Sequence, residues 1–288
     1  MSALPYDFRP LKNSDEELGE TFALLRSVWP VNNRLTLKYL DWLYRENPAG
    51  RAIGCNAYHG GRLAGHYVII PFSAQLDGQN FTAALSLNTA VDESHRGQGL
   101  FRKLAEATYA TAAEDGIDHV VGIANANSTP GFVKSLGFQL VTQLEPYLIF
   151  GKAEVLLTGN VSWRRNWTAD SLAWRLSAPQ CSYWFDPRGE SLSVYGQTKY
   201  VGLYGVLKVE DNPELQLTIR RHLKSITTLR PTLWFGKSPR LKLPAAALRF
   251  PERLRPSPFN LIFRDLSGAH RQLDGGSIHF EAVDFDVM

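Results

Sequence analysis

The chain has 288 residues, of which 44% are hydrophobic and 20% charged, an ordinary balance for a globular protein. No apolar stretch approaches the roughly 20 residues of a membrane-spanning helix, and the first ten residues lack the apolar core of a secretory signal. The two cysteines, Cys55 and Cys181, lie far apart without a partner motif, which argues against a disulfide framework or a zinc site. We therefore expect a cytoplasmic protein that binds no metal and no membrane.

The net charge of +3 is unevenly distributed along the chain. Residues 1–150 carry 12 Lys and Arg against 15 Asp and Glu, which gives −3. Residues 151–288 carry 19 against 13, which gives +6. This asymmetry predicts two parts with different electrostatic roles.

The first half mixes helical and strand periodicities. Ser14 followed by Glu17 has capping-box spacing, Gly60-Gly61 indicates a turn between strands, and Gly116 marks a helix end. The predicted elements are a strand at 6–11, helices at 14–29 and 35–45, strands at 53–58, 63–76 and 81–91, a polar loop at 94–98, a helix at 100–114, a strand at 119–124, a short helix at 129–136 and a strand region at 139–150. This order predicts an α+β fold with a mostly antiparallel central sheet flanked by helices.

A similar order partly recurs after residue 152. The predicted elements are a helix at 168–176, strands at 181–185, 191–195 and 200–209, a helix at 213–224, and strands at 232–235, 259–266 and 277–286. We therefore expect two domains, 1–151 and 152–288, the second a degenerate copy of the first.

The most informative segment is LSLNTAVDESHRGQGLFRKL, residues 85–104. Its loop, Arg96-Gly97-Gln98-Gly99, joins a predicted strand directly to a predicted helix. Unpaired N–H groups and the helix dipole make such a helix start an anion site, and glycines let a phosphate approach the backbone. A glycine-rich loop alone is a weak signal, but a buried strand and the Gly137-Phe138 pair follow in order. The segment therefore indicates phosphate binding.

These residues resemble the GNAT family of acyl-CoA N-acyltransferases, whose phosphate motif is Q/R-x-x-G-x-G/A. Arg96-Gly97-Gln98-Gly99-Leu100-Phe101 matches it except at the last position, where Phe101 is expected to narrow the space beside the pyrophosphate. The resemblance implies coenzyme A as co-substrate, with Thr89 polarising the thioester carbonyl through its backbone N–H. The implied CoA-binding residues are Asn88, Thr89, Ala90 and Val91 beside the pantetheine arm, Arg96, Gly97, Gln98, Gly99, Leu100 and Phe101 around the pyrophosphate, and Asn125, Asn127 and Ser128 at the pantetheine amides. For Asn125 and Asn127, capping of the local loop is an equally good interpretation.

The chain departs from the family where side-chain catalysts are usual. Leu85 occupies the place of the family's general-base carboxylate, and Val133 that of its acidic tyrosine. His66 and Glu145 could act as bases through water, but nothing in the sequence supports either. A lone histidine on a strand is more often a structural hydrogen-bonding group. The base and the acid stay unassigned, and positioning with thioester polarisation would supply most of the rate.

The second half is basic and aromatic. Residues 220–255 contain ten Lys and Arg and one acidic residue, Glu252. The aromatic residues that could form flat binding surfaces in this half are Trp163, Trp167, Trp174, Trp184, Tyr200, Tyr204 and Trp234. Cations and flat rings suit a nucleotide diphosphate, although a solvated face and core packing would explain the same residues. Glu210-Asp211-Asn212-Pro213 stands where a second phosphate loop would lie, so no second CoA site is expected.

The chain also resembles, more loosely, tandem-GNAT enzymes that N-acylate nucleotide-linked amino sugars. The resemblance rests on residues 42–44 with 47–48, on 173–175, and on 259–265 with 284–286. It implies acylation of a dTDP- or UDP-linked amino sugar, a small anionic acceptor. The alternatives are a peptide or aminoacyl acceptor, and a non-catalytic CoA-responsive or nucleic-acid-binding protein. Nucleic acid is disfavoured because the basic run lies in one loop-rich segment without a recognisable reading helix.

Overall fold

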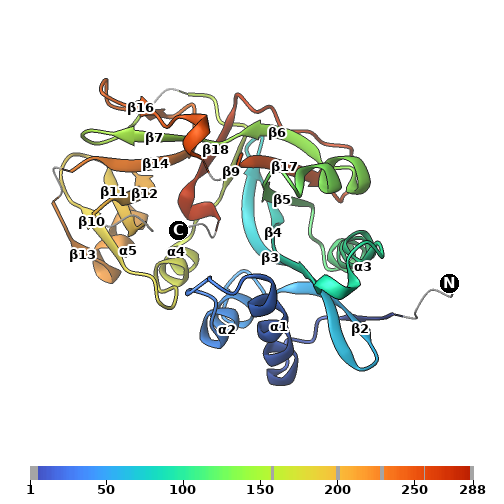
Figure 1. Cartoon of the computed structure of the whole chain (residues 1–288). Helices are drawn as coiled ribbons and strands as arrows, with labels where there is room; N and C mark the ends of the chain where they lie inside the picture. The colour runs from blue at the N-terminus through green and yellow to red at the C-terminus, as the bar shows by residue number, and fades with distance from the viewer. Residues whose placement is uncertain (1–5, 157–158, 199–201, 228–229, 256, 286–288) are drawn as a thin grey trace. The chain divides into compact units, whose positions relative to one another are not determined.

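The computed structural model describes residues 6–156, 159–198, 202–227, 230–255 and 257–285 (Figure 1). Its α-helices are α1 Asp15–Val28, α2 Leu37–Arg45, α3 Leu100–Glu114, α4 Ala169–Leu176 and α5 Pro213–His222. Its strands are β1 Asp7–Pro10, β2 Ile53–His59, β3 Arg62–Leu76, β4 Gln79–Val91, β5 His119–Ala124, β6 Gln139–Gln143, β7 Glu145–Ile149, β8 Glu154–Val155, β9 Trp163–Arg165, β10 Tyr183–Asp186, β11 Leu192–Gln197, β12 Tyr204–Glu210, β13 Lys224–Ser225, β14 Thr232–Lys237, β15 Leu241–Lys242, β16 Leu248–Arg249, β17 Asn260–Asp265 and β18 Ile278–Glu281. Short helical turns are η1 Glu93–His95, η2 Gly131–Ser135, η3 Glu252–Leu254 and η4 Ala282–Asp284.

Contacts divide the chain into two compact units that interleave along the sequence. Unit 1 comprises Met1–Phe72, Thr82–Leu140 and Ile262–Gln272, and unit 2 comprises Ser73–Phe81, Val141–Leu261 and Leu273–Met288. The sequence predicts a single boundary at 151/152, which stays a prediction, whereas the division by contacts exchanges segments across that point. The physical reason is that a strand belongs to whichever sheet its backbone hydrogen bonds join, and local sequence does not encode that partner.

Unit 1 is a sheet in the order β1-β2-β3-β4-β5-β17. β2 and β3 are antiparallel, whereas β4 and β5 are parallel. One stripe of α3 is buried against this sheet, because apolar residues recur at helical spacing from Leu100 through Leu104 to Ala112. Tyr67 of β3 and Phe132 of η2 complete the same core. The start of α3, at Gly99, is thereby fixed at one end of this packed layer.

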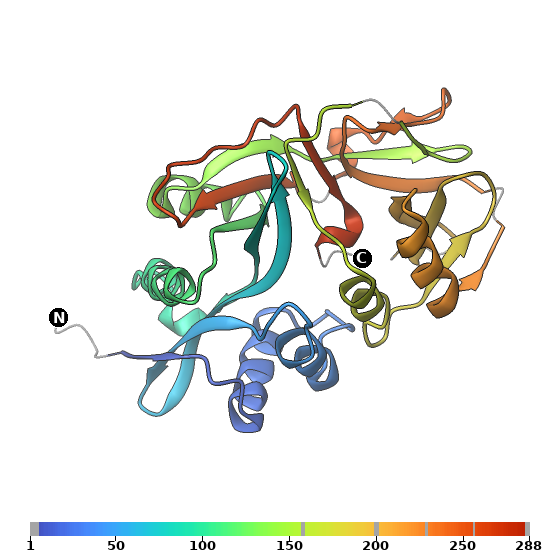
Figure 2. The ribbon, with the colours of Figure 1, turned by 180° about the vertical axis from the view of Figure 1, so that it is seen from behind.

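Unit 2 repeats the order of unit 1. In unit 1, three strands β2-β3-β4 precede α3 and then β5, which is parallel to β4. In unit 2, the antiparallel strands β10-β11-β12 precede α5 and then β14, which is parallel to β12. α4 and α5 lie side by side (Figure 2). The α+β class is therefore confirmed, and unit 2 has the element order that a degenerate second copy predicts.

Several expected elements differ in detail from those observed. The strand region 139–150 is broken at Leu144 into β6 and β7. The expected short helix at 129–136 is helical throughout, and its middle part, Gly131–Ser135, is wound as a π-helix. The last strand ends at Glu281 and is followed by the turn η4. The expected strand 200–209 is β12, and Tyr200 lies outside the described residues. No helix in the described part of the chain is long and apolar enough to span a membrane.

Candidate functional site

The loop Arg96–Gly99, called the glycine loop below, leads into α3 as the motif predicts. Gly97 and Gly99 both have positive φ, 74° and 73°, and Gly99 is the N-cap of α3 without any side-chain cap. A Cβ added at either glycine would meet no atom within 4 Å. Successive backbone N–H groups in such a conformation form an anion-binding concavity. Gly97, Gln98, Gly99 and Leu100 thus lie together at a helix start without a side-chain cap, and phosphate binding by them stays a prediction.

Arg96 is the first residue of this loop and contacts the end of β4. Its Nε donates to the carbonyl of Val91 at 3.4 Å, and its guanidinium lies 3.8 Å from the carboxylate of Glu93. Because 54% of the Arg96 side chain is exposed and this pair is wide, the guanidinium is accessible to another anion.

The Phe101 ring packs into the core. It meets Phe132 edge-on at 5.1 Å between centroids and Tyr67 at 6.2 Å. A Cβ at Gly131 would lie 3.0 Å from the Phe101 ring, so η2 approaches this ring closely. The ring thus fills the space between α3 and η2, and the expectation that Phe101 narrows the space beside the pyrophosphate stays a prediction.

The backbone pairing of β4 with β5 ends partway along β4, within unit 1. Their pairing runs from Ala83↔His119 to Ser86↔Gly122 and stops there. Two residues later Asn88 takes φ 50°, a left-handed conformation within a strand. The predicted site residues Asn88, Thr89, Ala90 and Val91 therefore follow the point of separation. A strand edge without a neighbour offers backbone N–H and C=O groups to an extended ligand.

The turn after β5 is held by hydrogen bonds among its own residues. The Asn125 Oδ1 accepts from the N–H groups of Asn127 (3.0 Å) and Ser128 (2.9 Å). The Ser128 Oγ accepts from the Asn125 N–H at 3.1 Å. The capping interpretation is therefore what the structure shows for the Asn125 oxygen, and contacts of Asn125, Asn127 and Ser128 with pantetheine stay a prediction.

A buried polar network lies beside Asn88. The Asn88 Nδ2 donates to the Tyr44 hydroxyl at 3.2 Å, this hydroxyl lies 3.0 Å from His66 Nε2, and His66 Nδ1 lies 2.7 Å from Asn56 Oδ1. His66 is fully buried, and burial lowers its pKa to about 3. Burial likewise raises the pKa of Tyr44 above its ordinary value. A neutral histidine sealed from solvent is a poor proton acceptor for catalysis, so the structural interpretation of His66 holds.

The other positions considered for acid–base chemistry offer no better candidate. Leu85 is buried in unit 1, with 7% of its surface exposed. Glu145 belongs to unit 2, where its carboxylate pairs with Arg249 at 2.6 Å and accepts from the Tyr147 hydroxyl at 2.8 Å. The Glu145 carboxylate therefore already has a cation and a hydroxyl as partners, which makes it a poor candidate for a general base.

Sequence reasoning missed a second hydroxyl cluster at the separation point. The Tyr67 hydroxyl bonds to Ser86 Oγ at 2.7 Å and to the Tyr109 hydroxyl at 2.5 Å. The Arg264 guanidinium lies 4.8 Å from the Tyr109 ring centroid. Burial raises the pKa of Tyr67 to about 12, so the hydroxyl stays protonated at neutral pH. Nothing in the local sequence joins β17, which carries Arg264, to this place.

The equivalent loop of unit 2 is blocked. The Asn212 Oδ1 accepts from the N–H groups of Glu214 and Leu215 at 2.9 and 3.3 Å, and Pro213 has no N–H to offer. Asp211 pairs with Arg240 at 3.2 Å. The first turn of α5 therefore lacks the open donors that the first turn of α3 has.

The basic and aromatic residues of unit 2 divide between core and surface. Trp163, Trp167 and Trp234 are buried, so core packing is their role. Trp174 and Trp184 are half-buried, and Trp184 meets Tyr204 edge-on at 5.5 Å. Arg249 pairs with both Glu145 and Glu252. Among the described residues, no group of three His, Cys, Asp or Glu side chains could hold a metal ion.

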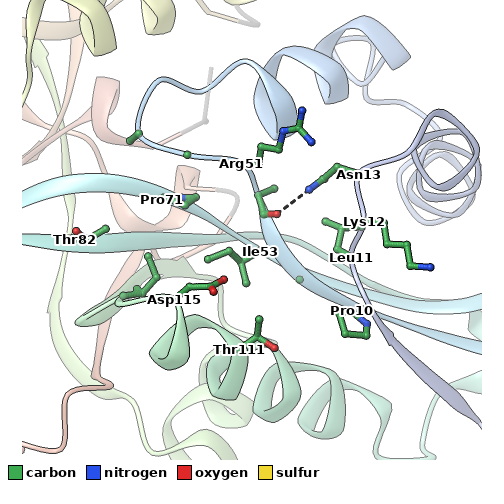
Figure 3. Close-up of a pocket in the computed structure, with 15 residues that line it drawn as sticks. Pro10, Leu11, Lys12, Asn13, Arg51, Ile53, Pro71, Thr82, Thr111 and Asp115 are labelled. Atoms are coloured by element: carbon green, nitrogen blue, oxygen red, sulfur yellow. Dashed lines mark hydrogen bonds between the residues drawn. The ribbon is translucent and has the colours of Figure 1, made fainter.

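A cleft of about 440 Å³ lies at the other end of α3 (Figure 3). Thr111 and Asp115 line it from α3, and Asn13, which donates to the Ala52 carbonyl, lines it from the segment after β1. With a rise of about 1.5 Å per residue, the two ends of the 15-residue α3 lie roughly 22 Å apart. The cleft is therefore separate from the glycine loop.

Comparisons with known proteins agree with this geometry. Residues 7–141 match the family model described as Acetyltransferase (GNAT) domain. Similar solved structures include a GCN5-related N-acetyltransferase from Anabaena variabilis ATCC 29413 (14% identity, TM-score 0.60, covering 90% of this chain and 73% of that one). Others are a GCN5-related N-acetyltransferase from Kribbella flavida (12%, 0.59, 91% and 72%) and Eis1 from Mycobacterium abscessus (14%, 0.52, 91% and 74%). At these identities the likeness shows the fold alone. A search of curated proteins found no match.

Proposed function

We propose that the chain transfers an acyl group from acyl-CoA to the amino group of a nucleotide-linked amino sugar, on the premise that residues 7–141, which match the GNAT acetyltransferase domain model, use acyl-CoA as that family does. The observation that carries the proposal is the glycine loop beside the end of β4, where the pairing of β4 with β5 has stopped while β3 still flanks its other edge. The loop supplies donors for the pyrophosphate, and β4 supplies a backbone edge for the pantetheine arm. Asn88, Thr89, Ala90 and Val91 are the residues of that edge.

The proposed chemistry needs little from side chains. The amine nitrogen bonds to the thioester carbon, the C–S bond breaks, the sulfur leaves with the electron pair, and the ammonium proton passes to solvent. The backbone N–H of Thr89 donates to the carbonyl oxygen as negative charge develops on it. A sugar amine is less basic than a lysine, so more of it is neutral near pH 7. Alignment of the two reactants then supplies much of the rate.

The nature of the acceptor is inferred from the second half. Residues 151–288 carry a net charge of +6, which favours an anionic molecule. In unit 2, Arg220 lies 5.6 Å from the Phe185 ring, and half-buried Trp174 and Trp184 add flat surfaces. A nucleotide diphosphate has both the charge and the base that such groups bind. The free thiols Cys55 and Cys181 suit a reducing compartment, so we place the reaction in the cytoplasm.

The decisive experiment is an acceptor screen. The purified protein is incubated with acetyl-CoA or a longer acyl-CoA and with dTDP- and UDP-amino sugars, and free thiol is measured. The proposal predicts thiol release that depends on the acceptor. CoA binding without thiol release for any sugar would contradict it. Turnover with peptide or aminoacyl amines alone would move the acceptor to that class. Steeply salt-dependent nucleic-acid binding without turnover would favour the non-catalytic alternative.

A further inference from the structure

Four side chains in unit 1 form one continuous hydrogen-bonded network, Asn56, His66, Tyr44 and Asn88. They come from β2, β3, α2 and β4 respectively. Asn56 and His66 are fully buried, Tyr44 is fully buried, and Asn88 is half-buried at the end nearest Thr89. The Tyr44 and His66 rings are stacked, with an interplanar angle of 18°. The network therefore joins the interior of the unit to the strand that carries the proposed acyl-transfer site.

The hydrogen bonds of this network run in one direction. In the described part of the chain the Asn56 amide is oriented with its oxygen 2.7 Å from His66 Nδ1 and its buried Nδ2 without a partner, and because an amide oxygen only accepts, this orientation places a hydrogen on Nδ1. Buried His66 is neutral, which leaves Nε2 as an acceptor, so the Tyr44 hydroxyl donates to Nε2. The Tyr44 oxygen then accepts from Asn88 Nδ2. At one end Asn56 accepts through its Oδ1, and at the other end Asn88 donates through its Nδ2, so both amides fit this direction.

This direction fixes what Asn88 presents. Because Nδ2 is held by Tyr44, the amide plane is set and the oxygen, an acceptor, is the atom that points away from the network. Asn88 also holds φ 50°, a left-handed conformation that asparagine adopts more readily than most other non-glycine residues and that the hydrogen bond to Tyr44 helps to hold. The anchored side chain therefore restrains both the amide and the backbone turn immediately before Thr89.

We propose that Tyr44 and His66 are positioning residues that hold Asn88 so that its side-chain oxygen accepts an N–H of the attacking amine while Thr89 donates to the thioester. This rests on the proposed acyl transfer. The thioester has no donor of its own, so an acceptor oxygen at this place favours a nucleophile that carries N–H groups. The network would thus select which molecule receives the acyl group, but it would not remove a proton from that molecule.

Kinetics of matched variants test this role. Tyr44→Phe removes only the hydroxyl and should lower kcat roughly tenfold, the loss of one aligned hydrogen bond, with the Kd for acetyl-CoA unchanged. Tyr39→Phe is the control, because Tyr39 lies on the same helix and its buried hydroxyl has no hydrogen-bond partner among the described residues. It should leave kcat unchanged. Equal kcat for Tyr44→Phe and wild type would overturn the inference.

Two further variants separate positioning from general destabilisation. Asn88→Gly keeps a backbone that tolerates positive φ and loses the amide, so it should match Tyr44→Phe, and the double variant should lose no more than either. His66→Gln can accept from Tyr44 and donate to Asn56, so it should retain most activity, whereas His66→Leu should not. Independent losses in the double variant would overturn the proposal.

A readout without turnover distinguishes this inference from the proposed function. Nitrogen-15 spectra of labelled histidine should show His66 as the neutral Nδ1–H tautomer throughout pH 5–8, with Nε2 perturbed in Tyr44→Phe. An Nε2–H tautomer would overturn the network's direction even if the enzyme is active. An inactive wild type with the Nδ1–H tautomer would refute the acyl transfer and, with it, the positioning role, while leaving the network's direction confirmed.

Discussion

The Tyr44 hydroxyl lies 3.0 Å from Nε2 of His66, inside unit 1 and away from solvent. This contact decides how His66 behaves. Its two ring nitrogens contact a hydroxyl and an amide oxygen, neither of which carries a charge that would stabilise the imidazolium. The histidine therefore stays neutral in the folded protein, and burial lowers its pKa to about 3.

We predict that His66 makes the protein less stable in mild acid. In the unfolded chain its pKa is about 6.5, so below that pH the unfolded state takes up a proton that the folded state refuses. Between pH 7.5 and 5.5 this lowers the free energy of unfolding by about 1.4 kcal/mol. Urea denaturation of wild type and His66→Gln at both pH values measures the effect.

The His66→Gln protein should lose less stability over that interval. His119 is also buried, with its pKa lowered to about 4, and contributes equally to both proteins, so its effect cancels in the comparison. Parallel stability losses in the two proteins would show that His66 is accessible to protons when folded, and would reopen its role as a base.

The glycine loop predicts a paired effect on CoA binding. Gly99 and Gly116 stand at opposite ends of α3 with φ 73° and 80°, and an added Cβ at either meets nothing within 4 Å. Alanine at either position strains the backbone by about 1–2 kcal/mol. Only Gly99→Ala also disturbs the anion cradle, so it should weaken CoA binding at least tenfold.

Calorimetric titration of CoA into both variants, with melting temperatures measured alongside, makes this comparison. Similar losses of stability with unequal CoA affinity are expected. If Gly116→Ala weakens CoA as much as Gly99→Ala, the effect belongs to the stability of α3 and not to the loop.

Local signals in the sequence predicted local features of the fold and site. The step from strand to glycine loop to α3 was recognisable because Gly97 and Gly99 are needed at positive φ, a requirement that residue type reveals. The repeated order of elements was also visible, because each helix and strand leaves its own local pattern of apolar residues. The network of Asn56, His66 and Tyr44 was not, since its members come from three elements and their pairing depends on tertiary packing. The membership of β17 in unit 1 is likewise a matter of long-range strand pairing.

Lys208 should be essential to the stability of unit 2. Its ammonium lies 3.0 Å from Glu210 and 3.7 Å from Glu281, and all three side chains are buried. Burial opposes the charge, but these carboxylates together with Asp284 raise the pKa of Lys208 above its ordinary value. Lys208→Met would remove the ammonium from between two buried carboxylates and leave only His279, 3.2 Å from Glu281, beside that carboxylate, at a cost of about 3–5 kcal/mol in the free energy of unfolding.

Denaturant titrations can set this variant against two others. Arg240→Met breaks the partly exposed pair with Asp211 and should cost no more than about 1 kcal/mol. The double variant Lys208→Met with Glu210→Gln should be more stable than Lys208→Met alone, because one uncompensated charge is removed. A loss for Lys208→Met no larger than that for Arg240→Met would mean that the pair is hydrated.

The two units repeat one topology, yet we predict that each chain binds a single CoA. A helix start binds a pyrophosphate only through N–H groups that are not already used. In α5 the first position is Pro213, which has no N–H, and the next two N–H groups donate to Asn212. The adjacent carboxylates of Glu210 and Asp211 would repel the phosphates. Calorimetry should therefore give a stoichiometry of one, abolished or greatly weakened by Gly99→Ala and unaffected by Asn212→Asp, which keeps the cap. A stoichiometry of two, or binding that survives in Gly99→Ala with unchanged affinity, would assign a CoA site outside the glycine loop.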